Sequence, residues 1–198
     1  MLVAVDGTIV ASAGFGDPVR VDARRAIDTL RKRGWTVGIL SGDHPEVVAS
    51  VGETLGLPRD RCVGGAAPEE KLRVVEQAGG NRTVVMVGDG VNDAAAMAAA
   101  SVGVGVHGGA EACLSTADVY LARPGLEPLV TLTDGAARTM GVIRRNIAFS
   151  IGYNLIGATL AVTGVITPLI AAVLMPASSL TVVLASWLSR TFQTERAS

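Results

Sequence analysis

The clearest chemical signal in the sequence is a run of glycines, carboxylates and an amide that directly follows an apolar segment. Residues 88–93 read Gly-Asp-Gly-Val-Asn-Asp, and the preceding residues 83–87 are typical of a buried β-strand. Two carboxylates there would repel a bare phosphate, but Asp89 and Asp93 suit a hard cation such as Mg²⁺. The cation would neutralise charge on a transferring phosphoryl group, which Asn92 could hydrogen-bond. The competing interpretation is a strand-ending turn in which Asp93 caps a helix.

Two weaker polar clusters accompany this run. Ser41, Gly42 and Asp43 follow a second apolar segment and precede a predicted helix, so their hydroxyl and backbone N–H groups favour an anion. The same three residues also make an ordinary turn with a cap. Lys71 lies on a predicted helix over 69–77, from which its amino group could reach a phosphate, although a lone exposed lysine is usually solvated.

The segments that must position these residues alternate between strand and helix patterns. Apolar segments at 35–40, 83–87 and 102–106 predict strands, and amphipathic segments between them predict helices. This alternation predicts a parallel sheet in an α/β layer, where function gathers at the carboxyl ends of the strands. Near the N-terminus, Asp6-Gly7 predicts the turn of a short hairpin.

The C-terminal part of the sequence is uncharged: no Asp, Glu, Lys or Arg occurs from Asn146 to Ser189. A bilayer crossing needs about 20 apolar residues, so this stretch predicts two transmembrane helices, over 147–165 and 169–188. Basic residues flank both ends, which predicts a multi-pass chain in a bacterial plasma membrane, with both termini cytoplasmic and membrane lipid as a partner. The alternative is a pair of buried helices in a soluble protein.

Composition narrows the function classes. The chain has 198 residues, a formal net charge of −1 and 49% apolar residues. The apolar fraction excludes disorder, and the balanced charge gives no footprint for nucleic acid, so no nucleic-acid partner is expected. The two cysteines, Cys62 and Cys113, have no metal-binding spacing and are interpreted as thiols in a reducing compartment.

Together the polar clusters resemble the later motifs of the haloacid dehalogenase-like phosphotransferase fold. With residues 17–20 (Asp-Pro-Val-Arg) and 68–71 (Pro-Glu-Glu-Lys), they look like the second half of the phosphorylation domain of P-type ATPases. Two membrane helices after that domain look like the last pair of a heavy-metal-transporting (P1B) ATPase. The resemblance covers essentially the whole chain but only the last third or less of such a pump. It implies a partial haloacid dehalogenase-like Rossmannoid parallel sheet over 1–125, a connecting helix over 126–146, a two-helix transmembrane hairpin over 147–189 and a cytoplasmic tail over 190–198.

The resemblance also implies roles for the polar residues. Asp89 and Asp93 would bind Mg²⁺, and the phosphoryl group of ATP would be held by the catalytic residues Lys71, Ser41, Gly42, Asp43 and Asn92. The Asp-Lys-Thr-Gly-Thr phosphorylation motif and the nucleotide-binding domain of such pumps do not occur in this sequence. The chain is therefore expected to be inactive alone and to need the N-terminal part of the pump as its partner.

Four residues in the uncharged stretch point to the transported ion. Tyr153-Asn154, and Met175 with Ser179, resemble ion-site residues of the copper-transporting subgroup, and a thioether suits Cu(I). Zinc and cadmium pumps usually carry an Asp-Lys pair in the last span, which this stretch does not contain. The resemblance therefore implies an ATP-driven heavy-metal cation pump with Cu(I) as cargo. The alternative is that the four side chains only pack and hydrogen-bond between helices.

Two other functions remain open. A membrane-tethered haloacid dehalogenase-like phosphatase would need a nucleophilic Asp two residues before Asp6, where this chain has Ala4. A non-catalytic membrane protein that assembles with a pump would tolerate the loss of Asp89, Asp93 and Lys71, all of which are present.

Overall fold

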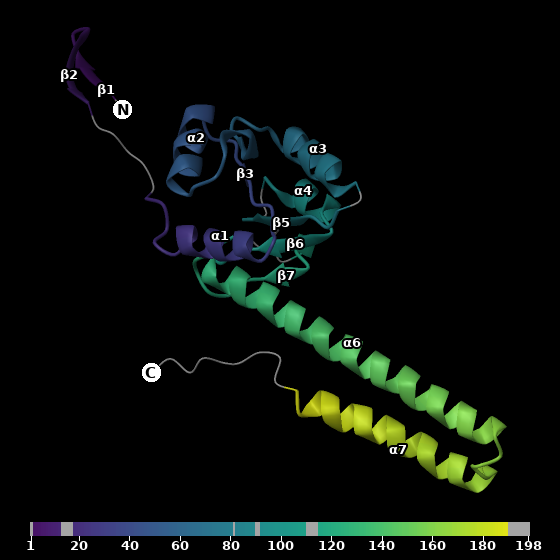
Figure 1. Cartoon of the computed structure of the whole chain (residues 1–198). Coiled ribbons are helices and arrows are strands. Elements are labelled where there is room, and N and C mark those ends of the chain that lie inside the picture. The colour runs from purple at the N-terminus through teal and green to yellow at the C-terminus, as the bar shows by residue number, and fades with distance from the viewer. Residues whose placement is uncertain (1, 13–17, 81, 90–91, 110–114, 190–198) are drawn as a thin grey trace, which may run out of the picture. The chain divides into compact units, whose positions relative to one another are not determined.

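The computed structural model of the chain describes residues 2–12, 18–80, 82–89, 92–109 and 115–189 (Figure 1). These residues fall into two compact units, Met1–Val130 and Thr131–Ser198. The N-terminal unit contains all of the described strands, and the second unit consists of long helices.

The N-terminal unit is built from parallel strands that alternate with helices. β5 (Val85–Gly88), β6 (Val102–Gly105) and β7 (Val119–Tyr120) form a parallel sheet in the order β5-β6-β7. β3 (Ile39–Leu40) pairs in parallel with β4 (Cys62–Val63). The predicted α/β layer is therefore confirmed, and β3 and β5 lead directly into the two polar clusters.

Helices separate these strands in the chain. They are α1 (Ala23–Lys32), α2 (Pro45–Thr54), α3 (Pro68–Gly79) and α4 (Ala94–Ala99), with one 3₁₀ turn, η1 (Arg59–Arg61), before β4. A proline occupies the first position of α2 and of α3, where its missing N–H costs no hydrogen bond. One face of α1 is buried, as the apolar spacing predicts; it carries Ala23, Ala26, Ile27 and Leu30.

Two apolar cores can be followed among the described residues of this unit. One joins Val75 of α3, Met86 of β5, and Ala96 and Met97 of α4, and Leu40 of β3 packs against it. Leu40 therefore ties the end of β3 to the core that lies under β5. The other core groups α1 with the end of α2: Ala23, Ile27, Leu55 and Leu57.

The start of α6 (Glu127–Val162) is held by a carboxylate from far back in the chain. Oδ2 of Asp22 accepts hydrogen bonds from the backbone N–H groups of Leu126 at 2.6 Å and Glu127 at 3.0 Å. At the other end of α1, Nη1 of Arg33 donates to the carbonyl oxygen of Val130 at 3.3 Å. The two ends of α1 thus fix the first turn of α6.

The N-terminal hairpin forms as predicted. β1 (Leu2–Val5) and β2 (Thr8–Ser12) pair antiparallel, with Val5 opposite Thr8. Asp6 and Gly7 between them have φ of 48° and 78°. Two successive positive φ values define the tight turn that suits the twist of a hairpin, and aspartate followed by glycine adopts them at low cost.

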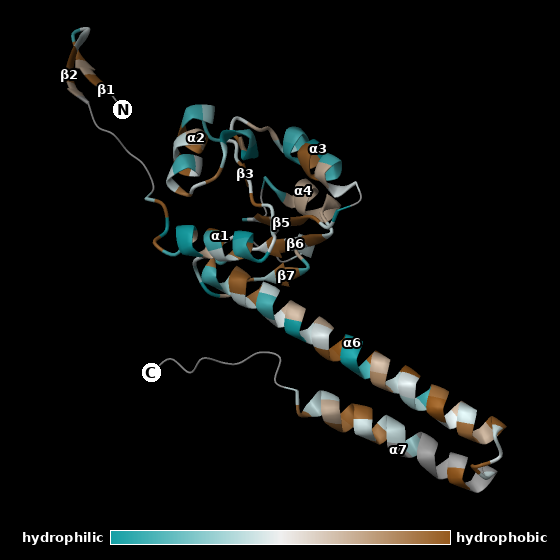
Figure 2. Ribbon diagram, in the orientation of Figure 1, coloured by the Kyte–Doolittle hydropathy of each residue, from teal (hydrophilic) through white to brown (hydrophobic). Residues whose placement is uncertain are grey.

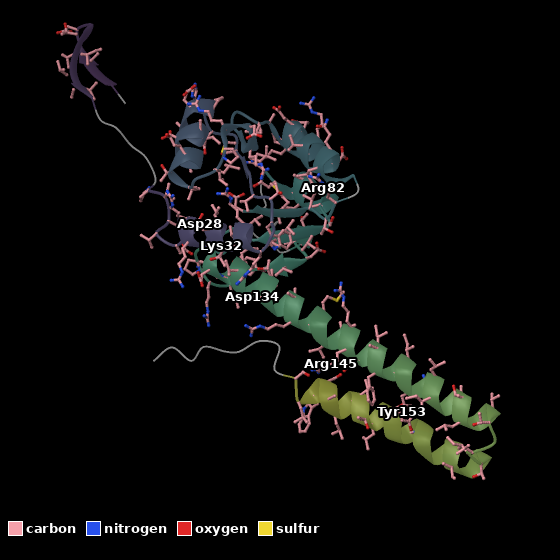
Figure 3. All side chains as sticks on the ribbon, viewed as in Figure 1. Asp28, Lys32, Arg82, Asp134, Arg145 and Tyr153 are labelled. Carbon is pink, nitrogen blue, oxygen red and sulfur yellow. The ribbon has the colours of Figure 1, made fainter. Side chains whose placement is uncertain are left out.

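The second unit contains the rest of α6 and the helix α7 (Pro168–Trp187). Gly164, with φ of 74°, follows the end of α6, and Thr167 caps α7 by accepting a hydrogen bond from the Ile170 N–H at 3.5 Å. Two hydrogen bonds join the helices near the end of α7. Arg145, labelled in Figure 3, donates to Ser189 at 3.0 Å, and Asn146 donates to Ser186 at 2.7 Å.

The prediction that these helices cross a membrane is wrong. Across the described parts of the chain, no helix combines the length and the apolar composition that a bilayer crossing requires. Figure 2 shows hydrophilic and intermediate residues interspersed with hydrophobic ones along α6. The predicted hairpin over 147–189 and the predicted multi-pass membrane location are corrected accordingly. For α6 the physical reason is that this helix lacks charge but not polarity over its second half, where it contains Asn146, Ser150, Tyr153, Asn154 and Thr159.

The predicted tail, 190–198, lies outside the described residues. The predicted boundary between 146 and 147 falls inside α6, which runs unbroken from Glu127 to Val162.

Replacing Asp22 with Ala is expected to lower the free energy of unfolding by about 1 kcal/mol at neutral pH, because α6 loses its cap. Burial acts to raise the pKa of Asp22, but hydrogen bonds from Glu127 and Leu126 outweigh it, so this pKa lies below its ordinary value of 3.8. A depressed pKa means that the stabilisation is present above that value and is lost as the pH falls through the folded-state pKa.

Urea unfolding of the wild-type chain and the Asp22→Ala variant, at neutral pH and at about pH 3, measures this effect. The difference between the two proteins should shrink in acid. An equal difference at both pH values would show that the charge of Asp22 is not the source. Asp22→Asn, which keeps one acceptor oxygen, should lie between them at neutral pH.

Candidate functional site

The acidic motif lies where β5 ends and α4 begins. β5 ends at Gly88, Asp89 follows with an exposed side chain, and Asp93 is the residue directly before α4. Asn92 is also exposed. The motif residues 90 and 91 lie outside the described residues. Both predicted Mg²⁺ ligands thus stand at the carboxyl end of a parallel strand.

Lys71 reaches this motif directly from α3. Its Nζ lies 2.6 Å from Oδ1 of Asp93, and the two side chains are only 10% and 13% exposed. Within the described part of the chain, Lys71 is the one charged residue that is buried. An ammonium group removed from water must have a partner, so this ion pair is a requirement of the fold at this point.

Asp93 also packs against the backbone of β5. A Cβ atom on Gly88 would lie 2.6 Å from Oδ2 of Asp93 and 2.9 Å from its Cβ, both far inside contact distance. One carboxylate oxygen of Asp93 therefore faces Lys71, and the other lies against Gly88. This arrangement explains why a glycine must end the strand.

The Ser41-Gly42-Asp43 cluster is organised by local hydrogen bonds. Oγ of Ser41 donates to Oδ2 of Asp43 at 2.8 Å, and the Asp43 N–H donates back to Oγ at 3.2 Å. The Ser41 backbone is fixed as well, since its N–H donates to Val63 and its carbonyl accepts from Ala66. Ser41 is half-buried, while Gly42 and Asp43 are exposed. The serine hydroxyl thus stands at the end of β3, held in place by Asp43.

The carboxylate oxygens at the end of β5 fit a magnesium ion that also binds a phosphate. Asp89 and Asp93 offer carboxylate oxygens, and Mg²⁺ commonly takes one or two carboxylates and completes its shell with water and phosphate oxygens. Lys71, which pairs with Asp93, adds positive charge beside these carboxylates. No three His, Cys, Asp or Glu side chains gather into a metal site among the described residues.

The residues predicted to bind the transported ion are described only in part. Tyr153 is half-buried, and its ring stacks on Phe149 with the ring centroids 6.3 Å apart. Figure 3 labels Tyr153 on α6. Asn154 on α6 and Ser179 on α7 are exposed, and the side chain of Met175 lies outside the described part. The ion-binding role of these four residues stays a prediction.

Comparison with known proteins decides the family. The family model described as "Hydrolase: haloacid dehalogenase-like hydrolase" matches residues 2–101, half of the chain. This chain belongs to the haloacid dehalogenase-like hydrolase family. The matched region includes Ser41, Lys71 and the acidic motif.

The relatives of this haloacid dehalogenase-like chain are heavy-metal P-type ATPases. It is 40% identical over 186 residues to a zinc-exporting P-type ATPase of Mycobacterium marinum, with 92% of this chain and 25% of that protein covered. It is 34% identical over 193 residues to a copper-exporting P-type ATPase of Mycobacterium leprae, with 97% and 24% covered. The chain therefore spans about a quarter of the length of these curated relatives.

A solved structure gives the same result. The crystal structure of a zinc-transporting PIB-type ATPase in the E2.Pi state matches with a TM-score of 0.86 and 31% identity, covering 96% of this chain and 31% of that one. The resemblance to heavy-metal P-type ATPases is confirmed by these matches, while the named metals differ between the relatives.

Gly109 lies beside the site, and the sequence analysis does not identify it. A Cβ atom on Gly109 would lie 2.5 Å from the carbonyl oxygen of Asp89, so the turn after β6 touches the acidic motif. The available signal is the pair Gly108-Gly109 after a strand pattern. That pair predicts a turn, but its spacing does not say which loop the turn contacts.

Replacing Lys71 with Met is expected to lower the free energy of unfolding by about 3–5 kcal/mol, because the mostly buried Asp93 carboxylate loses its partner. The matched control is Arg73→Met on the same helix. Arg73 pairs with Glu70 at 3.4 Å, but the two side chains are 65% and 42% exposed. Losing this pair should cost less than about 1 kcal/mol. Chemical denaturation of the full chain measures both changes.

A double-mutant cycle separates the ion pair from its surroundings. The double variant Lys71→Met/Asp93→Asn should lose much less unfolding free energy than the sum of the two single losses. Asp93→Asn removes the carboxylate charge that Lys71→Met leaves without a partner. Additive costs would contradict the ion pair.

Proposed function

We propose that this chain is the Mg²⁺- and phosphate-binding part of an ATP-driven heavy-metal P-type ATPase. The observation that carries the proposal is the 2.6 Å ion pair between Lys71 and Asp93, beside Asp89 at the end of β5. The carboxyl ends of parallel strands are where α/β folds bind their ligands. The family match and the P-type ATPase relatives support the same function.

In this function the acidic motif binds the cation, and Lys71 binds both the acidic motif and the phosphoryl group. Asp89 and Asp93 would hold Mg²⁺, which when bound would neutralise negative charge on the transferring phosphoryl group. Lys71 keeps Asp93 in place through Oδ1 and directs its remaining N–H protons at a phosphoryl oxygen. The same amino group thereby positions a ligand and binds the substrate.

The remaining site residues bind the phosphoryl group by hydrogen bonds. The hydroxyl of Ser41 lies at the end of β3, where it donates to Asp43. When the phosphoryl group binds, this hydroxyl donates to a phosphoryl oxygen instead. The backbone at Gly42 and Asp43 and the side-chain amide of Asn92 add donors from exposed positions.

The phosphoryl acceptor is an aspartate outside this sequence. Its carboxylate oxygen attacks the γ-phosphorus of ATP in line, an acyl phosphate forms, and ADP leaves. Asp6 does not fill this role in our proposal, because it forms the turn between β1 and β2, and the phosphatase nucleophile position is Ala4. The N-terminal part of a pump supplies the acceptor and the nucleotide site.

The proposed cargo is a heavy-metal cation, with Cu(I) favoured. The thioether of Met175 is a soft ligand, and a copper-exporting relative is 34% identical to this chain. Tyr153 and Asn154 on α6 and Ser179 on α7 would add further ligands for the ion. Because another relative is named for zinc, Zn²⁺ is the competing cation in every test.

The purified chain with ATP, Mg²⁺ and Cu(I) is expected to form no hydroxylamine-labile acyl phosphate, because it holds no acceptor aspartate. Co-expression with an N-terminal pump fragment that carries the Asp-Lys-Thr-Gly-Thr motif should restore the label. Labelling should depend on Cu(I) more than on Zn²⁺. Label on the isolated chain would overturn the proposal and make Asp6 the first residue to replace.

Substitutions in the reconstituted pump assign the roles. Asp89→Asn and Asp93→Asn should each reduce labelling at least about 100-fold, since a metal clamp contributes several kcal/mol to phosphoryl transfer. The matched control is Asp28→Asn on α1 (Figure 3), which should label like the wild type. Equal labelling by all three variants would exclude a Mg²⁺-binding role for the acidic motif.

A further inference from the structure

A tight turn directly after β6 folds back onto the acidic motif. Beyond the last paired residue of β6, the Val106 N–H donates to the Gly88 carbonyl oxygen at 3.1 Å. The turn is closed by a hydrogen bond from the Gly109 N–H to the Val106 carbonyl oxygen, also at 3.1 Å. Gly108 is the third of the four turn residues and has φ of 87°. A β-turn with positive φ at this position favours glycine there.

Gly109 brings this turn against the backbone of Asp89. A Cβ atom on Gly109 would lie 2.5 Å from the Asp89 carbonyl oxygen and 3.2 Å from its carbonyl carbon, as well as 3.1 Å from the Val106 carbonyl oxygen. These are backbone atoms, which cannot swing aside as the tip of a side chain can. A methyl group at this position must therefore displace either the turn or Asp89.

The two neighbouring glycines are required for different reasons. Gly108 is required by its positive φ, and nothing lies within 4 Å of the position its Cβ would take. Gly109 has no such φ, and it is required by its contact with Asp89. This difference makes the pair a matched set for experiment.

We propose that Gly109 is a positioning residue of the Mg²⁺ site, which lets the turn after β6 brace Asp89. The inference rests on the proposed function, because it treats Asp89 as a Mg²⁺ ligand. Asp93 is held by Lys71 through its side chain. The side chain of Asp89 is exposed, so backbone contacts fix the position of Asp89. Mg²⁺ accepts ligands only near octahedral positions at about 2.0–2.1 Å, so a shift of a few tenths of an ångström weakens binding.

Gly109→Ala tests this role, with Gly108→Ala as the matched control, because the same methyl group one residue earlier strains the turn without meeting Asp89. Mg²⁺ titrations of the full chain, followed by the amide NMR signals of Asp89 and Asn92, measure binding without any activity. Gly109→Ala should raise the half-saturating Mg²⁺ concentration at least about 10-fold, and Gly108→Ala less than about 3-fold. In the reconstituted pump, the Mg²⁺ dependence of labelling should shift in the same order.

A measurement on the wild type keeps the inference testable if Gly109→Ala does not fold. Hydrogen exchange at the Gly109 N–H should slow when Mg²⁺ is added, although Gly109 offers no side-chain ligand. If the exchange rate of Gly109 does not change with Mg²⁺ while the Asp89 amide signal does, the positioning role of Gly109 is contradicted.

The outcomes separate this inference from the proposed function. If the wild type responds to Mg²⁺ and Gly109→Ala responds at the same concentration, only the positioning role is overturned. If the wild type shows no Mg²⁺ response in NMR or in labelling, the proposed function and the positioning role both fail.

Discussion

A buried ammonium group must keep its partner, and this requirement organises the site. The side chain of Lys71 is only 10% exposed, so Asp93 has to remain beside it. The ion pair joins the first turn of α3 to the start of α4, and the contact of Asp93 with Gly88 adds the end of β5. The same three elements share one apolar core, so the packing of that core and the position of a candidate ligand are not independent.

Among the described residues of the N-terminal unit, three glycines lie so close to an aspartate that a Cβ atom would come within 3 Å of it. In each case the carboxylate or its backbone occupies space that a side chain on the glycine would fill. The aspartate is thereby held by the main chain and not only by flexible side chains, which limits how far it moves. The pairs are Gly88 with Asp93, Gly109 with Asp89, and Gly125 with Asp22.

Local chemistry was predictable from the sequence, whereas contacts distant in the chain were not. The Asp6-Gly7 turn follows from the φ preferences of two adjacent residues. The bond from Leu126 to Asp22 joins residues 104 apart, and no pattern in either segment indicates the other. Lys71 was placed in the site by resemblance, but its burial depends on Asp93, which only the fold brings close. The membrane prediction failed because no described helix has both the length and the apolar composition of a bilayer crossing.

The charges of the proposed site impose an order on binding. Lys71 with the carboxylates of Asp89 and Asp93 leaves one net negative charge at the end of β5, which repels a phosphoryl group. Mg²⁺ bound by these carboxylates would reverse the sign of this charge, so that the site would attract the transferring group. Asp93 would then interact with two cations, with Lys71 through Oδ1 and with the proposed Mg²⁺.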